Sequence, residues 1–278
     1  MPEAPETAGA VLRRHGIRAD KRLGQHFLLD PGILRRVVAA AAPLAGRTVL
    51  EIGPGPGGLT ASLLASDAAR VVAVERDPRF LPPLQELAER HPGRLTLVPA
   101  DALRFDPAPL AADGPLLVVA NLPYNVGTEL LLGWLHRLEL FERLVLMFQK
   151  EVALRLAAAP GTADYGRLAV LAQRLCVVER LFDLPPTAFT PPPRVSSSVV
   201  RLVPRPDRPE PEALAALEAV TRAAFGQRRK MLRASLRSLS PDTEALLAAA
   251  GIEATRRAES LSLAEFERLA EVWRSSGR

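Results

Sequence analysis

The sequence predicts an α/β fold with a doubly wound, mostly parallel sheet, followed by a small all-helical domain. Short apolar runs alternate with segments of helical spacing up to about residue 205, and a glycine-rich turn follows the first run. A stretch rich in proline and charge, VPRPDRPEPEA (203–213), separates this alternation from a purely helical pattern. We therefore expect an N-terminal extension over residues 1–20, an α/β domain over 21–205 and a helical domain over 206–278.

Five apolar runs are predicted to be buried strands. They are nearly continuous in valine and leucine instead of alternating with polar residues, which is typical of parallel strands covered on both faces. Helical spacing between them indicates βαβ units. The strands are TVLEIG (48–53), VVAVER (71–76), LTLVPA (95–100), LLVVAN (116–121) and LVLMFQ (144–149), and the helices are LTASLLASD (59–67), RFLPPLQELAERH (79–91) and TELLLGWLHRL (128–138).

Two further strands and four helices are expected later in the chain. LCVVERLFDL (175–184) and SSSVVRLVP (196–204) are joined by the proline-rich FTPPPRV (189–195), so they are expected to pair antiparallel at a sheet edge. After the composition break, helical patterns occur at 213–225, 228–239, 241–251 and 262–276.

The charge of the chain suggests an anionic partner. The formal net charge is +5 and the pI is about 10.1. The segment 222–237 carries six basic residues and no acid, which favours phosphate contacts over a merely solvated helix face. The candidate phosphate-binding residues are Arg222, Arg228, Arg229, Lys230 and Arg233.

Several classes of protein are disfavoured by the same sequence. No apolar stretch has the length of a membrane span and no hydrophobic signal core is present, so we expect a cytoplasmic protein. A single cysteine, Cys176, and histidines without metal-ligand spacing predict neither a disulfide framework nor a metal site. No long apolar helix stripe demands a partner chain, which favours a monomer.

The glycine-rich turn EIGPGPGGLT (51–60) predicts a nucleotide-type site. It ends the first strand and opens a helix, and Gly53, Gly55 and Gly58 allow a ligand to approach bare backbone. Glu75 closes the second strand 22 residues after Gly53, where an acid can hold ribose hydroxyls. Dinucleotides and S-adenosylmethionine (SAM) are both bound in this way.

Two further acids favour SAM. A carboxylate at Glu51 would repel a pyrophosphate on the helix N-terminus, whereas it suits the sulfonium and ammonium groups of SAM. Asp101-Ala102 follows the third strand, where the acid can accept a hydrogen bond from the amine of the cofactor's adenine.

The fourth strand ends in Asn121-Leu122-Pro123-Tyr124, an Asn-x-Pro-Tyr motif of the kind found in amino-methyltransferases. The exocyclic amine of adenine is a poor nucleophile because its lone pair is delocalised into the ring. The Asn121 side-chain oxygen and the main-chain carbonyl near Pro123 can accept from its N–H groups and aim the lone pair at the methyl group. Tyr124 can stack on the base. These features predict methyl transfer to an adenine amine.

Six motifs occur in order along the chain: KRLGQHFL (21–28), EIGPGPGGLT (51–60), NLPYN (121–125), YGRL (165–168), FTPPPRVSSSVVRL (189–202) and FGQRRK (225–230). Together they resemble the ribosomal RNA small-subunit adenine dimethyltransferases of the KsgA/RsmA type. The resemblance implies a Rossmann-like SAM-dependent methyltransferase domain followed by a helical domain that contacts RNA. It also implies transfer of methyl groups from SAM to N6 of two adjacent adenosines near the 3′ end of 16S rRNA, within the small (30S) ribosomal subunit or its precursor, with a role in ribosome biogenesis.

The same resemblance implies roles for individual residues. Tyr124 and Phe189 correspond to aromatic residues that hold the flipped adenine, although Phe189 also fits a core aromatic before a proline loop. Arg228, Arg229 and Lys230 correspond to RNA-backbone contacts. The residues placed against SAM are His26, Leu28, Gly53, Glu75, Asp101 and Asn121.

The chain departs from the family at two places. His26 stands where the family usually has asparagine, and Val126-Gly127-Thr128 replaces a frequent Ile-Ser-Thr, but neither change touches the predicted acceptors. Three other functions stay open. They are a large-subunit rRNA adenine methyltransferase of the antibiotic-resistance type, a mainly non-catalytic small-subunit assembly factor, and a nicotinamide-dependent oxidoreductase.

Overall fold

The computed structural model describes residues 6–20 and 24–276, which form two compact units. Unit 1 contains the described residues up to Ala153 together with Glu179–Pro204. Unit 2 contains Leu154–Val178 together with the described residues from Arg205 onward. The first three residues of the KRLGQHFL motif lie outside the described residues.

Unit 1 is built on a seven-stranded sheet with the order β4-β3-β2-β5-β6-β9-β7. The strands β2 to β6 pair in parallel, and β9 pairs antiparallel with β6. The predicted Rossmann-like sheet is therefore confirmed, with β7 at one edge. The strands are β2 (Thr48–Ile52), β3 (Arg70–Glu75), β4 (Leu95–Pro99), β5 (Leu116–Asn121), β6 (Phe141–Gln149), β7 (Cys176–Leu184) and β9 (Ser197–Pro204).

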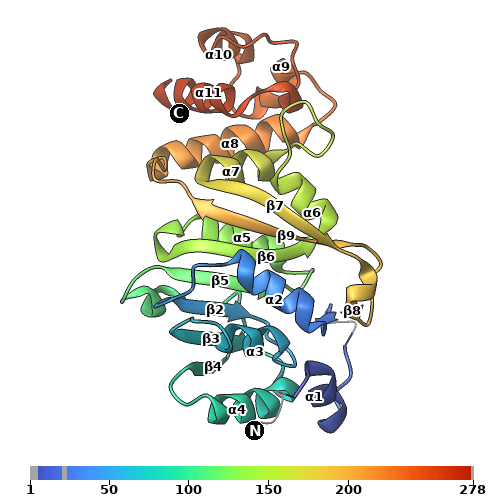
Figure 1. Ribbon diagram of the computed structural model, residues 1–278. Coiled ribbons are helices and arrows are strands. Elements are labelled where there is room, and N and C mark those ends of the chain that lie inside the picture. Colours follow the sequence, from blue (N-terminus) through green and yellow to red (C-terminus); the bar gives the residue numbers. More distant parts are fainter. Residues whose placement is uncertain (1–5, 21–23, 277–278) are drawn as a thin grey trace. The chain divides into compact units, whose positions relative to one another are not determined.

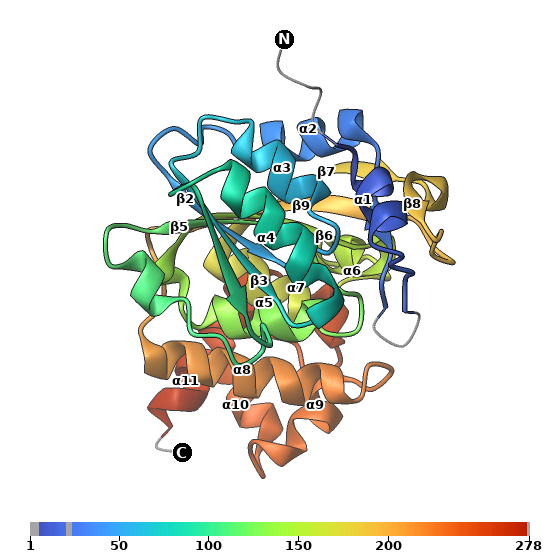
Figure 2. The same ribbon diagram turned by 90° about the horizontal axis from the view of Figure 1, so that it is seen from below.

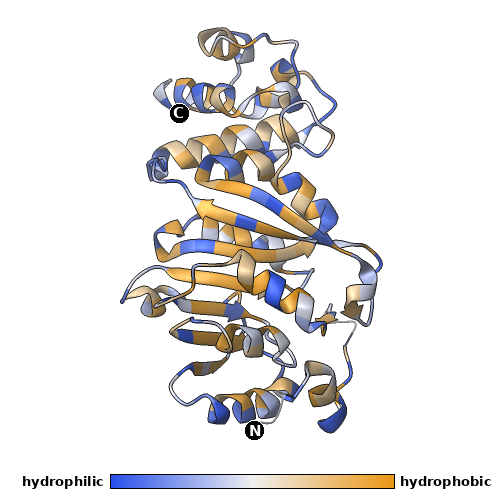
Figure 3. Ribbon diagram, in the orientation of Figure 1, coloured by the Kyte–Doolittle hydropathy of each residue, from blue (hydrophilic) through white to orange (hydrophobic). Residues whose placement is uncertain are grey.

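Helices cover both faces of this sheet, as its apolar strands require. In Figures 1 and 2, α2 and α3 lie on one face and α5 lies on the other. The central strands are apolar along most of their length (Figure 3), and every residue from Val71 to Val74 and from Leu116 to Ala120 is buried. The helices of the N-terminal part are α1 (Ala8–Arg14), α2 (Pro31–Ala40), α3 (Gly58–Leu64), α4 (Leu81–Arg90), α5 (Gly127–Leu135) and α6 (Lys150–Leu156).

The strand order determines where a ligand can bind. The chain proceeds from β2 outward through β3 to β4, and then returns to the other side of β2 to form β5 and β6. Such a reversal leaves a crevice at the carboxyl ends of the two strands that flank it. The ends of β2 and β5 carry Glu51 and Asn121, so two predicted site residues meet at this crevice.

A separate two-stranded sheet lies beside this edge. It pairs β1 (Phe27–Leu28) antiparallel with β8 (Phe189–Thr190), with Leu28 opposite Phe189. This pairing holds the segment that follows Gln25 next to the proline-rich loop. It was not expected from the sequence, since two-residue strands carry no periodic pattern.

Unit 2 contains more of the chain than the helical domain predicted from the sequence. Residues 154–178 are predicted from the sequence to lie in the α/β domain, but in the structure they group with the C-terminal helices. The reason is a shared hydrophobic cluster in which Tyr165 and Val170 are buried together with Leu217 and Phe266. The helices are α7 (Arg167–Leu175), α8 (Pro211–Gly226), α9 (Leu232–Ser235), α10 (Thr243–Ala249) and α11 (Leu263–Ser275).

The helix predicted over 228–239 is wrong in its first part. The helix α8 ends at Gly226, and residues 227–230 form a turn closed by a hydrogen bond from Lys230 N to Gln227 O (2.8 Å). Glycine is a poor helix former, so continuation of the helix beyond Gly226 is disfavoured. The Arg228–Lys230 triplet therefore lies in a loop.

Within the described residues, no helix has both the length and the apolar character needed to cross a membrane.

Candidate active site

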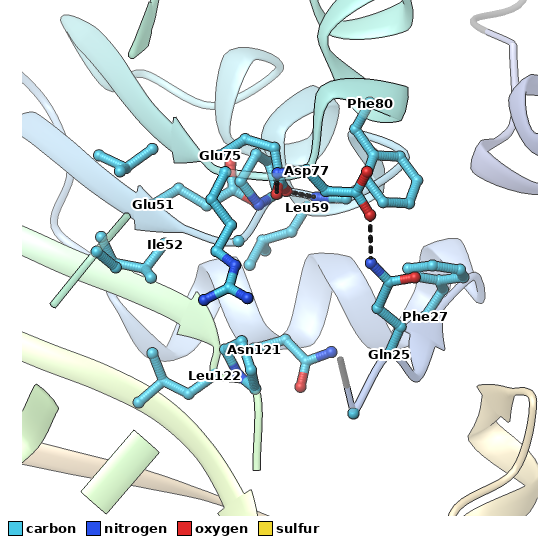
Figure 4. A pocket seen from close by; sticks show the side chains of 18 of the residues that line it. Gln25, Phe27, Glu51, Ile52, Leu59, Glu75, Asp77, Phe80, Asn121 and Leu122 are labelled. Carbon is cyan, nitrogen blue, oxygen red and sulfur yellow. Dashed lines mark hydrogen bonds between the residues drawn. The ribbon is translucent and has the colours of Figure 1, made fainter. Parts of the chain in front are cut away.

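A pocket lies at the carboxyl ends of β2, β3 and β5 in unit 1 (Figure 4). Its walls come from the segment after residue 23, the glycine-rich turn, the end of β3 and the Asn-x-Pro-Tyr segment. The structure brings together all of the predicted cofactor-binding residues around this one pocket. They are His26, Leu28, Glu51, Gly53, Gly55, Glu75, Asp101, Ala102 and Asn121.

The glycine-rich turn forms a tight backbone cradle. Gly53 and Gly55 have φ of 65° and 53°, a left-handed conformation that side-chain-bearing residues rarely adopt. A Cβ at Gly55 would lie 3.3 Å from the ring of Phe27, and one at Gly58 would lie 3.1 Å from Cβ of Ala8. The turn therefore needs glycine both for its own conformation and for the close approach of the N-terminal segment.

Glu75 connects the turn to the end of β3. Its two carboxylate oxygens accept backbone N–H groups from Gly55 (3.1 Å) and Asp77 (2.8 Å). Burial raises the pKa of this carboxyl, and the two backbone donors oppose the shift. Glu75 thus orients the glycine-rich turn and also lines the pocket wall.

Glu51 is a buried acid with an unsatisfied oxygen. Burial raises its pKa to about 8, the nearby Glu75 charge acts in the same direction, and the Thr60 hydroxyl opposes the shift. Among the described residues, Glu51 Oε2 and Thr60 Oγ1 have no hydrogen-bond partner in good geometry. A buried carboxyl that lines a pocket is ready to pair with a cation, whose charge would lower this pKa and ionise the group.

Replacing Glu51 by glutamine is expected to remove a pH-dependent destabilisation of the ligand-free protein. Between the ordinary pKa near 4.5 and the folded-state pKa of about 8, the unfolded chain releases this proton while the folded chain retains it. Stability therefore falls as pH rises through this window, with a slope of at most about 1.4 kcal/mol per pH unit. Chemical denaturation at pH 4 and pH 8.5 should show E51Q close to wild type at the lower pH, which lies below both pKa values, and more stable at the higher one.

The exposed Glu139 supplies the control for this measurement. E139Q should follow wild type at both pH values. An E51Q variant that gains no stability at pH 8.5 would contradict the assignment of Glu51 as a protonated buried acid.

Asp101 lies at the outer end of the pocket. Its Oδ1 accepts the backbone N–H of Leu103 (3.0 Å), and its Oδ2 lies 3.3 Å from Nη1 of Arg76. The turn after β4 therefore orients the carboxylate, and both of its oxygens keep a lone pair that can accept a hydrogen bond from a ligand amine.

Asn121 is the last residue of β5, and its side chain points into the pocket (Figure 4). Its Nδ2 donates to the backbone carbonyl of His26 (3.1 Å), which orients the amide and leaves Oδ1 as an acceptor. The carbonyl oxygen of Pro123 accepts from the N–H groups of Val126 (3.1 Å) and Gly127 (3.0 Å) at the start of α5. The predicted second acceptor therefore cannot be Pro123 O without breaking these bonds, which leaves Leu122 O as the candidate.

Tyr124 also lines the pocket and is held at two places. Its hydroxyl lies 2.5 Å from Oγ of Ser197, and its ring is stacked on His26 with centroids 5.5 Å apart. Burial raises the pKa of the Tyr124 phenol, and the contact with Ser197 opposes this rise. His26 Nδ1 lies 2.8 Å from the carbonyl oxygen of Pro191, which fixes the ring against the proline-rich loop.

Phe189 is not brought into the pocket. It belongs to β8 opposite Leu28, is 3% exposed, and lies in the hydrophobic cluster that includes Leu34 and Val199. The alternative considered from the sequence, a core aromatic before the proline loop, describes its position. The aromatic residues that line the pocket are Phe27, Phe80, Tyr124 and His26.

The predicted phosphate-binding residues are exposed in unit 2. The guanidinium of Arg228 donates to the carbonyl of Ala163, and Arg233 Nη1 lies 3.8 Å from Glu244. Neither Arg229 nor Lys230 forms an ion pair within the part of the chain that the structure describes. These two charges are therefore available to an external anion.

Sequence reasoning missed a polar network on the N-terminal side of the pocket. Gln25 Nε2 donates to Asp77 Oδ2 (2.7 Å), and Arg79 donates both to Asp77 and to the backbone carbonyl of Arg18 (2.9 Å). These bonds tie the chain before His26 to the loop after Glu75. The only sequence signal was the pair of acids at positions 75 and 77, since the partners are 52 residues apart.

The fold and this pocket define the chain as a SAM-dependent methyltransferase. Bare glycine backbone, an acid at the end of β3 and a buried carboxyl with an unsatisfied oxygen suit a cofactor with cationic groups, and the Asn-x-Pro-Tyr segment forms the adjoining wall. A pyrophosphate would meet Glu51 instead, which disfavours the dinucleotide alternative.

Comparison with known proteins identifies the family. The family model described as "Ribosomal RNA adenine dimethylase" matches residues 16–274. The chain is 59% identical to ribosomal RNA small subunit methyltransferase A of Methylobacterium radiotolerans, over 95% of this chain and 91% of that protein. It is 55% identical to the protein of the same name from Gluconobacter oxydans, over 94% and 86% of the two chains.

Two solved structures of rRNA-type or adenosine methyltransferases also resemble this chain in fold. A dimethyladenosine transferase from Plasmodium falciparum has a TM-score of 0.72 at 26% identity, covering 88% of this chain and 96% of that one. The 23S rRNA methyltransferase ErmE has a TM-score of 0.69 at 30% identity, covering 88% and 98%. The chain belongs to the ribosomal RNA adenine dimethylase family, and it is an enzyme that transfers methyl groups from SAM to rRNA.

Proposed function

We propose that this enzyme dimethylates N6 of two adjacent adenosines near the 3′ end of 16S rRNA, in the small ribosomal subunit or its precursor. The observation that carries the proposal is the placement of Asn121 and Tyr124 on the wall of the cofactor pocket. Identity of 59% to a small-subunit methyltransferase, against 30% to a large-subunit one, supports the choice of subunit. The enzyme would act as a cytoplasmic monomer in ribosome biogenesis.

The pocket residues suggest how the amine is activated. Bound SAM supplies an electrophilic methyl group. Asn121 Oδ1, oriented by the bond from its own Nδ2 to His26, would accept one N–H of the target amine, and the Leu122 carbonyl would accept the other. Both contacts draw the nitrogen lone pair out of conjugation, and Tyr124 would stack on the flipped base. The amine can lose its proton after attack, so no strong base is required.

The cofactor would be held by residues from three strand ends. Glu75 would accept the ribose hydroxyls, Asp101 the adenine amine, and Glu51 would ionise next to the cationic groups. Backbone of Gly53 and Gly55 would approach the cofactor where no side chain intervenes.

The exposed basic loop of unit 2 would contact the rRNA backbone. R229A and K230A are each expected to weaken binding to 30S particles and to lower the slope of log affinity against log salt by about one. Filter binding across a salt series measures this slope, and SAM affinity should stay at the wild-type value. R90A, which removes an exposed charge from α4 of unit 1, is the matched control. If both loop variants have the same slope as wild type, this loop does not contact the RNA.

A competition assay distinguishes the proposed function from its alternatives. Unmethylated 30S and 50S particles are offered together with labelled SAM, and each subunit is then counted. The proposal predicts label in the 30S fraction. Label in 50S would identify the resistance-type enzyme, and a chain that binds 30S without transferring label would be an assembly factor.

A further inference from the structure

Ser197 lies behind the Asn-x-Pro-Tyr segment, although 73 residues separate it from Tyr124. It is the first residue of β9 and is fully buried at 0% exposure. Its hydroxyl lies 2.5 Å from the Tyr124 hydroxyl, and it does not line the pocket. Its hydrogen bond to the tyrosine therefore links it to the pocket wall.

The backbone around Ser197 is firmly positioned. Ser197 pairs with Gln149 in the β6–β9 ladder, and the neighbouring Ser196 carbonyl accepts the N–H of Lys150 (2.9 Å). The ammonium of Lys150 pairs with Asp183 of β7 at 2.7 Å. The pairing of β9 with β6 thus fixes the backbone position from which the Ser197 hydroxyl meets the tyrosine.

The opposite restraint on Tyr124 comes from the N-terminal segment. His26 stacks on the ring with an interplanar angle of 28°, and its Nδ1 lies 2.8 Å from Pro191 O. One face of the tyrosine is therefore occupied, which leaves a single face for an aromatic ligand. If the target base stacks on the free face of Tyr124, the tilt of the tyrosine ring must be fixed. The stacking contact with His26 alone does not fix this tilt, because the tyrosine ring can still rotate against the histidine ring.

We infer that Ser197 is a positioning residue: its hydroxyl anchors the Tyr124 hydroxyl and so fixes the ring plane on which the target adenine stacks. This inference rests on the proposed function for the identity of the base. It predicts that the two hydroxyls act as one unit, so that loss of either has the same effect as loss of both.

The two tyrosines of the chain, Tyr124 and Tyr165, allow a direct test. With 3-fluorotyrosine at both positions, ¹⁹F NMR of the cofactor-free protein reports one site in each unit, and Y165F assigns the signals. S197A should shift or broaden the Tyr124 signal and leave the Tyr165 signal unchanged. S198A, which removes a neighbouring buried hydroxyl that bonds Asp183 instead, should leave the Tyr124 signal unchanged. An unaltered Tyr124 signal in S197A would overturn the inference.

Kinetics on 30S particles supply the second readout. S197A and Y124F should each lower kcat by about 5- to 10-fold, the effect of one hydrogen bond, with KM for SAM unchanged. The double variant should be no slower than Y124F alone, and S198A should match wild type. The inference would be overturned if the two reductions in kcat multiply in the double variant, or if S197A has the kcat of wild type. Failure of the wild-type enzyme to methylate 30S would instead reject the proposed function, since the NMR result needs no substrate.

Discussion

Replacing Asn121 by alanine is expected to abolish most of the methyl transfer, with kcat on 30S particles lowered by about 10²- to 10³-fold. The side chain is oriented by its own bond to the His26 carbonyl, so its oxygen is preorganised for the amine at no cost during the reaction. Single-turnover kinetics with labelled SAM measure the loss. The fold should persist, because Asn121 ends its strand instead of packing in the core.

Denaturant midpoint and SAM affinity are the controls for this variant. The midpoint should stay close to that of wild type, and the SAM dissociation constant should change by much less than kcat. An N121A enzyme with kcat within about threefold of wild type would exclude the amide as the acceptor for the target amine.

Replacing Glu75 by alanine should produce the largest loss of cofactor binding. The carboxylate orients the glycine-rich turn through Gly55 N and is proposed to hold the ribose, so both the cradle and a ligand contact are lost. Hydrogen bonds to a charged group are worth about 1.5–3 kcal/mol, which corresponds to a roughly 10- to 100-fold higher dissociation constant for SAM. Isothermal titration calorimetry gives this constant directly.

Two variants show whether the Glu75 effect is specific. E75Q keeps one acceptor oxygen and should lose less affinity than E75A. E89A removes an exposed acid from α4 and should bind SAM as wild type does. Equal SAM affinity in E75A and wild type would place the ribose elsewhere.

The sheet could be predicted well because its strands are buried on both faces. A parallel strand between two helical layers must be apolar throughout, so LLVVAN (116–121) is recognisable without reference to any distant residue. The position of the pocket could also be predicted, because the carboxyl ends of neighbouring parallel strands meet at one edge of the sheet. Glu51, Glu75 and Asn121 each end or nearly end a strand, and the structure places all three on one pocket.

The unpredicted features depend on contacts between distant residues. Phe189 lies in the core because β8 pairs with β1, and a two-residue strand has no signal in the sequence. The helix α7 joins unit 2 because Val170 shares a core with Phe266, which lies far along the chain. The side chains of Ser197 and Gln25 form hydrogen bonds with residues far away in the sequence, which no local periodicity reports.

We propose that the enzyme dimethylates adenosines of small-subunit rRNA, and that Asn121 and Tyr124 on the wall of the SAM pocket hold the target base. Mass spectrometry of nuclease fragments from 16S rRNA, after reaction of unmethylated 30S with wild type and N121A, tests it most directly. We expect two adjacent N6,N6-dimethyladenosines in a fragment near the 3′ end with wild type and unmodified adenosines with N121A. Dimethyladenosine formed equally by both enzymes, or found only outside that fragment, would contradict it.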